Sequence, residues 1–217
     1  MSDAVPDTVP DPGVTSELFA RRRLILILLL LLAEIVIFFA GLYTPLSTSA
    51  RQVLANQTSS QFGAVESGST VQLVAFIFAH NLSIALFEMV PVAGALLFAF
   101  SVYSTGIAAQ ALVASQGLPT QWGAVIFAFP YSLVELSAYA VAVVAGAMLF
   151  VSWRKKRLMW ELKVFVLEGA TVAVILLVAA AMEAATVRVS YLLGFALWLP
   201  TGLALAGIVL LVRRMHR

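Results

Sequence analysis

Long apolar stretches separated by short polar segments dominate this chain. The first runs from Leu24 to Tyr43 and, at about 1.5 Å per residue, is long enough to cross about 30 Å of hydrocarbon. Similar stretches recur almost to the C-terminus. We therefore predict an all-α, polytopic integral membrane protein with six transmembrane helices, at about 24–43, 71–90, 92–113, 122–152, 164–182 and 191–212.

Two polar segments flank the first span. Residues 1–20 are rich in Pro, Asp and small residues, and we expect a disordered tail ahead of a single transmembrane domain over 21–217. The polar segment 44–70 predicts the one sizeable loop, with at most a short surface helix around Ser49–Asn56.

The fourth apolar stretch is too long for one straight crossing, and it contains Pro130. Proline removes a backbone donor and clashes with the preceding turn of a helix. We therefore expect a short half-helix, a break or kink at Pro130, and a full helix from Tyr131 to about Val151.

Composition identifies the solvent as lipid. Hydrophobic residues make up 62% of the 217, and charged residues only 11%, against roughly 25% in a soluble domain. Mean hydropathy is +1.00. The absence of cysteine excludes disulfides, thiolate metal sites and a Cys nucleophile. The pI near 9.2 does not imply nucleic acid, because the basic residues are placed as topological signals.

The distribution of Lys and Arg predicts the orientation. With six crossings, only Arg51 and Arg188 of the 13 Lys and Arg residues fall on one side. The positive-inside rule then puts the N- and C-termini in the cytoplasm, and we expect the plasma membrane as the location. Anionic lipid headgroups would add about 1 kcal/mol per basic side chain at the cluster Arg154, Lys155, Lys156 and Arg157.

Several glutamates lie within the predicted spans. Glu34, His80 and Glu135 fall near mid-membrane, Glu88 and Glu168 toward the cytoplasmic side. Glu183 falls at the outer edge. An acidic side chain at the centre costs about 2.5–3.5 kcal/mol, so such residues usually face a cavity or a partner. We expect Glu34 and Glu135 to be protonated, or to share a proton or hydrogen bond with His80, Asn81 or a hydroxyl.

Each of these residues also has a structural interpretation, in which one hydrogen bond ties two helices together. That interpretation is favoured for Glu34, alone in a helix of Leu and Ile, and for Glu88 and Glu168, shallow enough to reach headgroups or water. Function is favoured for Glu135, which shares a helix with the break. The candidate polar centre is therefore Glu135, Pro130, His80, Asn81 and Glu34, with Glu168, Glu183 and Glu88 secondary.

An enzyme is not the first expectation. Phe76-Ile-Phe-Ala-His80 matches half of the motif of the intramembrane glutamate proteases that process prenylated proteins, but their paired-glutamate half is absent. Two histidines are too few for a histidine-rich metal site. We therefore expect no catalytic residue, metal or cofactor.

The middle of the chain, from about Phe76 to Ala185, resembles the stage II sporulation protein M family of integral membrane proteins. The resemblance rests on His80-Asn81, Gly94, Gly106, FPYSLVELSAYAVAVVAG at 129–146 and AAAMEA at 179–184. The family often has His, Gly and Pro where this chain has Tyr131, Ser132 and Ser137. The positions that match its motifs are Pro130, Glu135, Asn81 and Glu183.

Members of that family help to assemble a membrane complex with cell-wall hydrolases, so the resemblance implies a non-enzymatic scaffold or assembly subunit. Its partners would be lipids and either a second copy or other subunits. The alternative is a transporter or channel subunit in which Glu34, His80 and Glu135 line a proton or cation path; a third is an intramembrane hydrolase. A cavity shared by those three side chains would favour transport, whereas dispersed, capped carboxylates would favour a scaffold.

Overall fold

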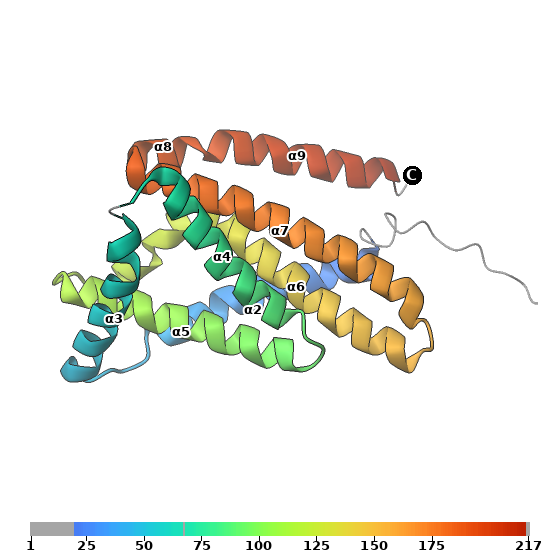
Figure 1. The fold of residues 1–217 in the computed structure, drawn as a ribbon, viewed down its shortest axis with the longest axis horizontal. Helices are drawn as coiled ribbons and strands as arrows, with labels where there is room; N and C mark the ends of the chain where they lie inside the picture. The colour runs from blue at the N-terminus through green and yellow to red at the C-terminus, as the bar shows by residue number, and fades with distance from the viewer. Residues whose placement is uncertain (1–19, 67, 216–217) are drawn as a thin grey trace, which may run out of the picture.

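The computed structural model describes residues 20–66 and 68–215, and these form a bundle of helices (Figure 1). The all-helical fold is thus confirmed for the described part of the chain. The tail expected over residues 1–20 lies almost wholly outside it, as do His216 and Arg217. The elements are α2 (Arg21–Leu42), α3 (Thr48–Glu66), α4 (Thr70–Glu88), α5 (Ala93–Ser115), η1 (Thr120–Ala128), α6 (Pro130–Arg154), α7 (Leu158–Arg188), α8 (Tyr191–Ala196) and α9 (Trp198–Met215).

Five of the helices in these ranges are long and apolar enough to cross a membrane: α2, α4, α5, α6 and α7. The stretch expected as a sixth span forms α8 and α9, which meet at Leu197, and neither helix is among those five. Six crossings therefore remain a prediction. In Figure 1, α9 runs back toward the end of the bundle where α2 begins.

Helix α6 lies at the centre of the bundle, and half of the residues in its most apolar stretch are buried. It packs against α7 and α2, while α2 also packs against α5, and α4 against α7. The main core combines side chains of α2, α4, α5, α6 and α7, including Phe38, Phe98, Val143 and Leu176. Segments far apart in the sequence are thereby fixed around a common interior.

Glycines allow two pairs of these helices to approach closely. A Cβ on Gly106 of α5 would lie 2.2 Å from the carbonyl oxygen of Phe38, and one on Gly41 of α2 would lie 2.1 Å from that of Tyr103. The second pair is α6 and α4: a Cβ on Gly146 of α6 would lie 2.5 Å from the carbonyl oxygen of Met89, which follows the last residue of α4. Small residues at these positions therefore allow direct backbone contact between α2 and α5, and between α6 and the turn after α4.

The expectation of a loop over 44–70 was wrong. Residues Thr48–Glu66 form the 19-residue helix α3, which packs mainly against α5. The backbone N–H of Ala50 donates to Ser47 Oγ, and that of Arg51 donates to the Ser47 carbonyl oxygen, so Ser47 caps the helix. The polar composition indicated exposure to water, but no proline interrupts the segment to prevent a helix.

The chain breaks immediately before Pro130. The 3-10 helix η1 ends at Ala128, Phe129 is extended, with φ −106° and ψ 135°, and Pro130 opens the 25-residue helix α6. Proline suits this first position because it has no N–H to leave unsatisfied. The break thus separates two helices, rather than bending one continuous helix at the proline. Carbonyl oxygens left by the break accept hydrogen bonds from Ser132 Oγ and Trp198 Nε1.

A tight turn joins α4 to α5. The N–H of Ala93 donates to the carbonyl oxygen of Pro91 at 2.8 Å, and Val92 between them has φ 68° and ψ −56°. These values define a γ-turn, a strained conformation for any residue with a Cβ and most of all for a β-branched one.

Replacing this valine should stabilise the protein. Glycine tolerates positive φ, so we expect Val92→Gly to raise the free energy of unfolding by about 1 kcal/mol, after the entropy it adds to the unfolded chain. Thermal unfolding in detergent measures the change. Val90→Gly, in the same turn but outside the strained position, should not be stabilising. A lower melting temperature for Val92→Gly would contradict the strained turn.

Candidate functional site

The interior of the bundle contains a cavity of about 540 Å³. Residues from α2, α3, α4, α5, η1, α6 and α7 line it, and most of the lining is apolar. Its polar side chains include three glutamates from three different helices: Glu34 of α2, Glu135 of α6 and Glu183 of α7. Because glutamates that line a cavity at membrane depth are candidates for function, this cavity is the candidate site.

Glu34 is the most unusual residue of the cavity. It is fully buried, at 0% exposure, and neither of its carboxyl oxygens has a hydrogen-bond partner among the described residues. A buried polar group without a partner is costly and rare. The expected role as a helix-pairing residue requires a hydrogen bond across helices, and the structure shows none in the described chain.

Glu135 has one hydrogen bond and several acidic neighbours. It accepts a hydrogen bond of 2.9 Å from the hydroxyl of Tyr139, one turn along α6. It also lies near enough to Glu34, Glu88 and Glu183 to interact electrostatically with each of them. The carboxyl groups that line the cavity therefore interact with one another through Glu135, whereas Glu88 acts on them from outside the cavity wall.

His80 and Asn81 occupy different parts of the cavity wall. Asn81 is buried, whereas His80 is exposed and stacks on Phe76 with ring centroids 6.3 Å apart. Of the described residues that line the cavity, His80 of α4 and Thr105 of α5 are the most exposed to the surroundings. The opening of the cavity therefore lies between α4 and α5.

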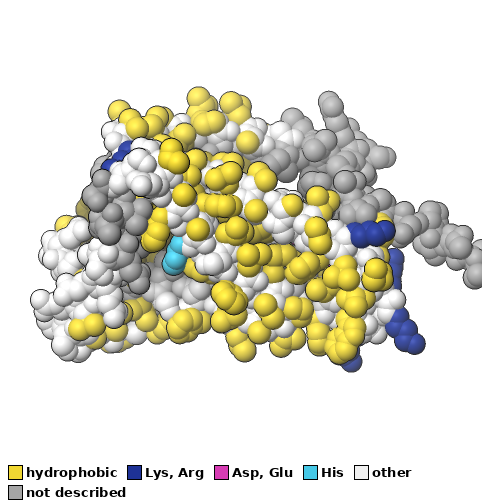
Figure 2. Space-filling model, viewed as in Figure 1, with side chains coloured by type: hydrophobic (Ala, Val, Ile, Leu, Met, Phe, Trp, Pro, Cys, Tyr) yellow, Lys and Arg dark blue, Asp and Glu magenta, His cyan; other side chains and the backbone are white. Residues whose placement is uncertain are grey.

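Figure 2 shows the surface around this opening. Hydrophobic side chains cover most of the face, the histidine surface (cyan) lies between them, and no acidic surface of the described residues is visible from this side. The exposed apolar side chains of α4 and α5 include Leu86, Phe87, Leu96 and Phe100. Four of the acidic side chains are buried inside the bundle, namely Glu34, Glu88, Glu161 and Glu168.

Pro130 is buried but does not line the cavity. The residues that follow it do: Tyr131, Ser132 and Glu135 are all part of the wall. By starting α6 at this depth, Pro130 sets which side chains of the first turns reach the cavity. Its role in the described structure is positional.

Glu88 and Glu168 do not reach headgroups or water, which corrects the expectation for both. Their exposures are 1% and 3%. Glu88 accepts a hydrogen bond of 2.8 Å from Ser101 Oγ and lies outside the cavity wall. Glu168 lies instead in an ion cluster, so each is held by the bundle itself.

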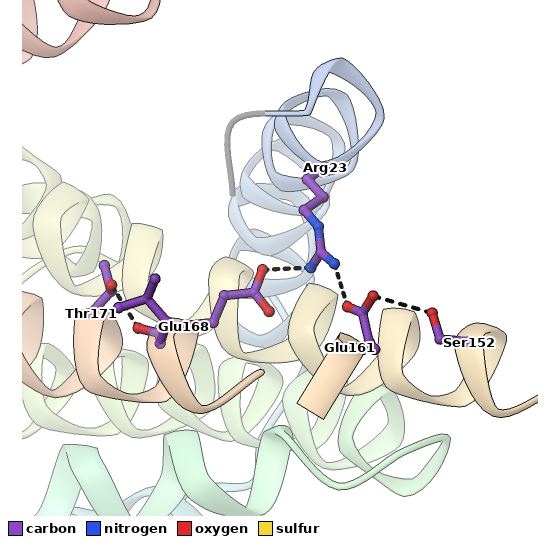
Figure 3. Close-up of polar contacts among 6 residues, drawn as sticks. Arg23, Ser152, Glu161, Glu168 and Thr171 are labelled. Carbon is purple, nitrogen blue, oxygen red and sulfur yellow. Dashed lines mark hydrogen bonds and ion pairs between the residues drawn. The ribbon is translucent and has the colours of Figure 1, made fainter. Parts of the chain in front are cut away.

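That ion cluster lies where α2 begins and α7 begins (Figure 3). Arg23 Nη1 donates to Glu168 Oε1 at 2.6 Å, and Arg23 Nη2 donates to Glu161 Oε1. Glu161 in turn accepts a hydrogen bond of 3.1 Å from Ser152 Oγ of α6. Arg23 is 0% exposed and Glu161 2% exposed. The cluster ties α2, α6 and α7 together.

The basic residues expected to meet headgroups lie on the surface at the α6–α7 turn. Arg154, Lys155, Lys156 and Arg157 are all exposed. Most of the Lys and Arg surface visible in Figure 2 gathers at this end of the bundle (dark blue). Their placement is compatible with contact with an anionic membrane surface.

The donor groups of the cavity do not form a metal cage. Within the described residues, no group of three or more His, Asp or Glu side chains could hold a metal ion. The described lining residues also include no Lys or Arg. What the arrangement can do is bind and exchange protons, or neutralise a positively charged molecule.

Sequence reasoning missed several residues of these sites. Arg23 was counted only as a topological signal, and Glu161 was placed in a loop. One signal was available, because Glu161 and Glu168 are seven residues apart and so share a helix face. Tyr139 follows Glu135 by four residues, the spacing of neighbours on a helix surface.

No protein-family model, no curated protein and no solved structure matches this chain.

Proposed function

We propose that this protein is a transporter or channel subunit that moves a proton or another cation through the membrane. The observation that carries the proposal is Glu34, a fully buried carboxyl group without a hydrogen-bond partner in the described chain, lining a cavity that it shares with Glu135 and His80. A carboxyl group kept unpaired in the interior is suited to a ligand that arrives and leaves.

In this proposal, each polar residue of the cavity has its own role in transport. Glu34 and Glu135 bind the cation or proton at depth, and Tyr139 orients Glu135 through its hydrogen bond. Glu183 is the acidic residue of α7 in the same wall, and His80 stands at the opening. The broken chain before Pro130 matches the interrupted helices that transporters use at their binding sites.

The orientation belongs to the same proposal. The end of the bundle with the exposed α6–α7 turn would face the cytoplasm, with both termini on that side and the basic turn on anionic lipid of the plasma membrane. The Arg23–Glu161–Glu168 cluster would then close the bundle on its cytoplasmic side.

A scaffold or assembly subunit is the second candidate, and one observation favours it. A Cβ on Gly202 or Gly207 of α9 would meet no described atom within 4 Å. Small residues on an open helix face allow a helix of a second copy or of another subunit to approach closely. The scaffold hypothesis also includes membership of the sporulation protein M family and a lack of catalytic activity, and both stay predictions.

Flux through reconstituted protein tests the transport proposal. Proteoliposomes with a pH dye inside receive a proton gradient, with the potential held at zero by valinomycin and equal K⁺ on both sides, and with or without Na⁺ or tetramethylammonium added outside. We expect wild-type protein to dissipate the gradient faster than protein-free liposomes. Glu34→Gln and Glu135→Gln should each reduce the rate by at least about tenfold, because the exchangeable proton is lost.

Glu88→Gln is the matched control. Glu88 is an equally buried glutamate, its hydrogen bond with Ser101 can be kept by glutamine, and it does not line the cavity. This variant should retain most of the flux. Wild-type protein indistinguishable from empty liposomes with all three cations, or Glu88→Gln as inactive as Glu34→Gln, would refute the cavity as a transport path.

A further inference from the structure

The acidic side chains at the depth of the cavity can carry negative charge, and the one histidine of its described wall, His80, lies at the opening. Three glutamates line the cavity, and none of its described lining residues is Lys or Arg. Glu34 is buried with both carboxyl oxygens unpartnered in the described chain, so a cation beside it would replace the missing partner. An anion would meet only like charge.

The size and the walls of the cavity suit an organic molecule. Its volume of about 540 Å³ falls within the roughly 300–1,000 Å³ of small-molecule sites. Aromatic rings are part of the wall, namely Phe38, Phe127, Tyr131 and Tyr139. Ring faces attract cations, and apolar walls stabilise an apolar body. A small hydrated ion would leave these walls unused.

The carboxyl groups are not arranged for a metal ion. As noted above, no three acidic or histidine side chains of the described chain converge closely enough to hold one. Hard cations need several oxygen ligands at once. A monocation that is large and weakly hydrated needs only one nearby negative charge.

The opening faces lipid. His80 lies near the middle of the 19-residue helix α4, and Thr105 near the middle of the 23-residue helix α5. Both helices are long and apolar enough to span the membrane, so their middles lie at hydrocarbon depth. The surface beside the opening is apolar. A molecule that passes this opening must therefore be soluble in hydrocarbon.

We infer that the cavity binds a hydrophobic organic monocation, which arrives from the lipid between α4 and α5 and rests against Glu34. This inference depends on the proposed function and names its substrate class. On binding, any proton on the Glu34 carboxyl group leaves along the proton path of the proposed function, so that one positive charge replaces another.

Binding of two ions of the same shape and opposite charge tests the inference. Purified full-length protein in detergent is dialysed against tetraphenylphosphonium or tetraphenylborate. We expect saturable binding of tetraphenylphosphonium alone. Glu34→Gln should weaken it by about 30-fold or more, the usual result of removing one partner of a buried charge pair. Glu88→Gln is again the control and should bind nearly as wild type does.

A second pair of variants tests the route without touching the carboxyl groups. Thr105→Trp would fill the opening, whereas Phe100→Trp changes an outward-facing residue of the same helix that does not line the cavity. In liposomes, Thr105→Trp should slow the association of tetraphenylphosphonium, and Phe100→Trp should not.

The outcomes separate this inference from the function on which it depends. Absence of tetraphenylphosphonium binding, equal binding of tetraphenylborate, or equal affinity in Glu34→Gln would overturn the substrate class. If proton flux persisted in that case, the proposed transport function would stand. Equal association rates for Thr105→Trp and Phe100→Trp would overturn the lateral route.

Discussion

Arg23→Gln is expected to lower the free energy of unfolding by about 3–5 kcal/mol, because it removes the buried charge to which Glu161 and Glu168 are both paired. Arg23 is the only basic side chain shown between Glu161 and Glu168 in Figure 3, and all three are almost completely buried. Glutamine can still donate hydrogen bonds, so the loss measures the charge. Unfolding in detergent, followed by circular dichroism, gives the change.

Arg21→Gln is the matched control, since Arg21 is an exposed arginine in the same first turn of α2. It should change stability by no more than about 0.5 kcal/mol. The triple variant with Arg23→Met, Glu161→Gln and Glu168→Gln removes every charge of the cluster and should recover most of the loss. If Arg23→Gln and Arg21→Gln were equally stable, the cluster would not hold the bundle together.

Gly106→Leu is expected to cost about 3 kcal/mol or more, and to reduce the yield of monodisperse protein. The added side chain would start 2.2 Å from the carbonyl oxygen of Phe38 and 2.8 Å from the amide nitrogen of Leu42. Both are backbone atoms, so α2 and α5 must move apart to make room. Size-exclusion chromatography and thermal unfolding report the effect.

The control for this substitution is Gly202→Leu in α9. A Cβ there meets no described atom within 4 Å, so the same chemical change should shift stability by no more than about 0.5 kcal/mol. Comparable losses in the two variants would indicate that leucine is harmful in these helices for a reason other than contact between α2 and α5.

The periodic alternation of apolar stretches and polar breaks was enough to predict the helical membrane class and most helix positions. The thickness of the hydrocarbon layer sets the length of each apolar stretch, and that length can be counted directly along the chain. The sequence wrongly predicted a loop where the structure has helix α3, because polar composition indicates exposure to water and not the backbone conformation. The last predicted span forms two helices, α8 and α9, that meet at Leu197, and it stays a prediction.

The sites were harder to predict, because they depend on which helix faces which. Arg23 lies 145 residues from Glu168 and 138 from Glu161, and nothing local indicates that its side chain turns inward. Glu34 was interpreted as a residue that pairs helices, since one hydrogen bond usually satisfies such a group. Only the assembled bundle shows that its neighbours leave it facing a cavity.

The gathering of Glu34, Glu135 and His80 around one cavity also changes the balance between the functional hypotheses. The sequence favoured a scaffold with dispersed carboxyl groups. The shared cavity is the feature that the transport hypothesis required, so we place transport first. The open glycine face of α9 is compatible with assembly as well, and the two functions do not exclude each other.

Labelling of a single cysteine in the cavity tests the central claim most directly, and the chain has no cysteine of its own. Ala108→Cys places a thiol on the α5 wall, and Phe100→Cys places one on the outer surface of the same helix. In proteoliposomes, a hydrocarbon-soluble cationic methanethiosulfonate should modify Ala108→Cys at least about tenfold faster than a hydrocarbon-soluble anionic one of similar size, because the acidic walls concentrate cations. Phe100→Cys should show no such preference, and Glu34→Gln with Glu135→Gln should abolish it at Ala108→Cys. Equal rates for the two reagents at Ala108→Cys, or no reaction with either, would contradict an accessible cavity lined by carboxyl groups.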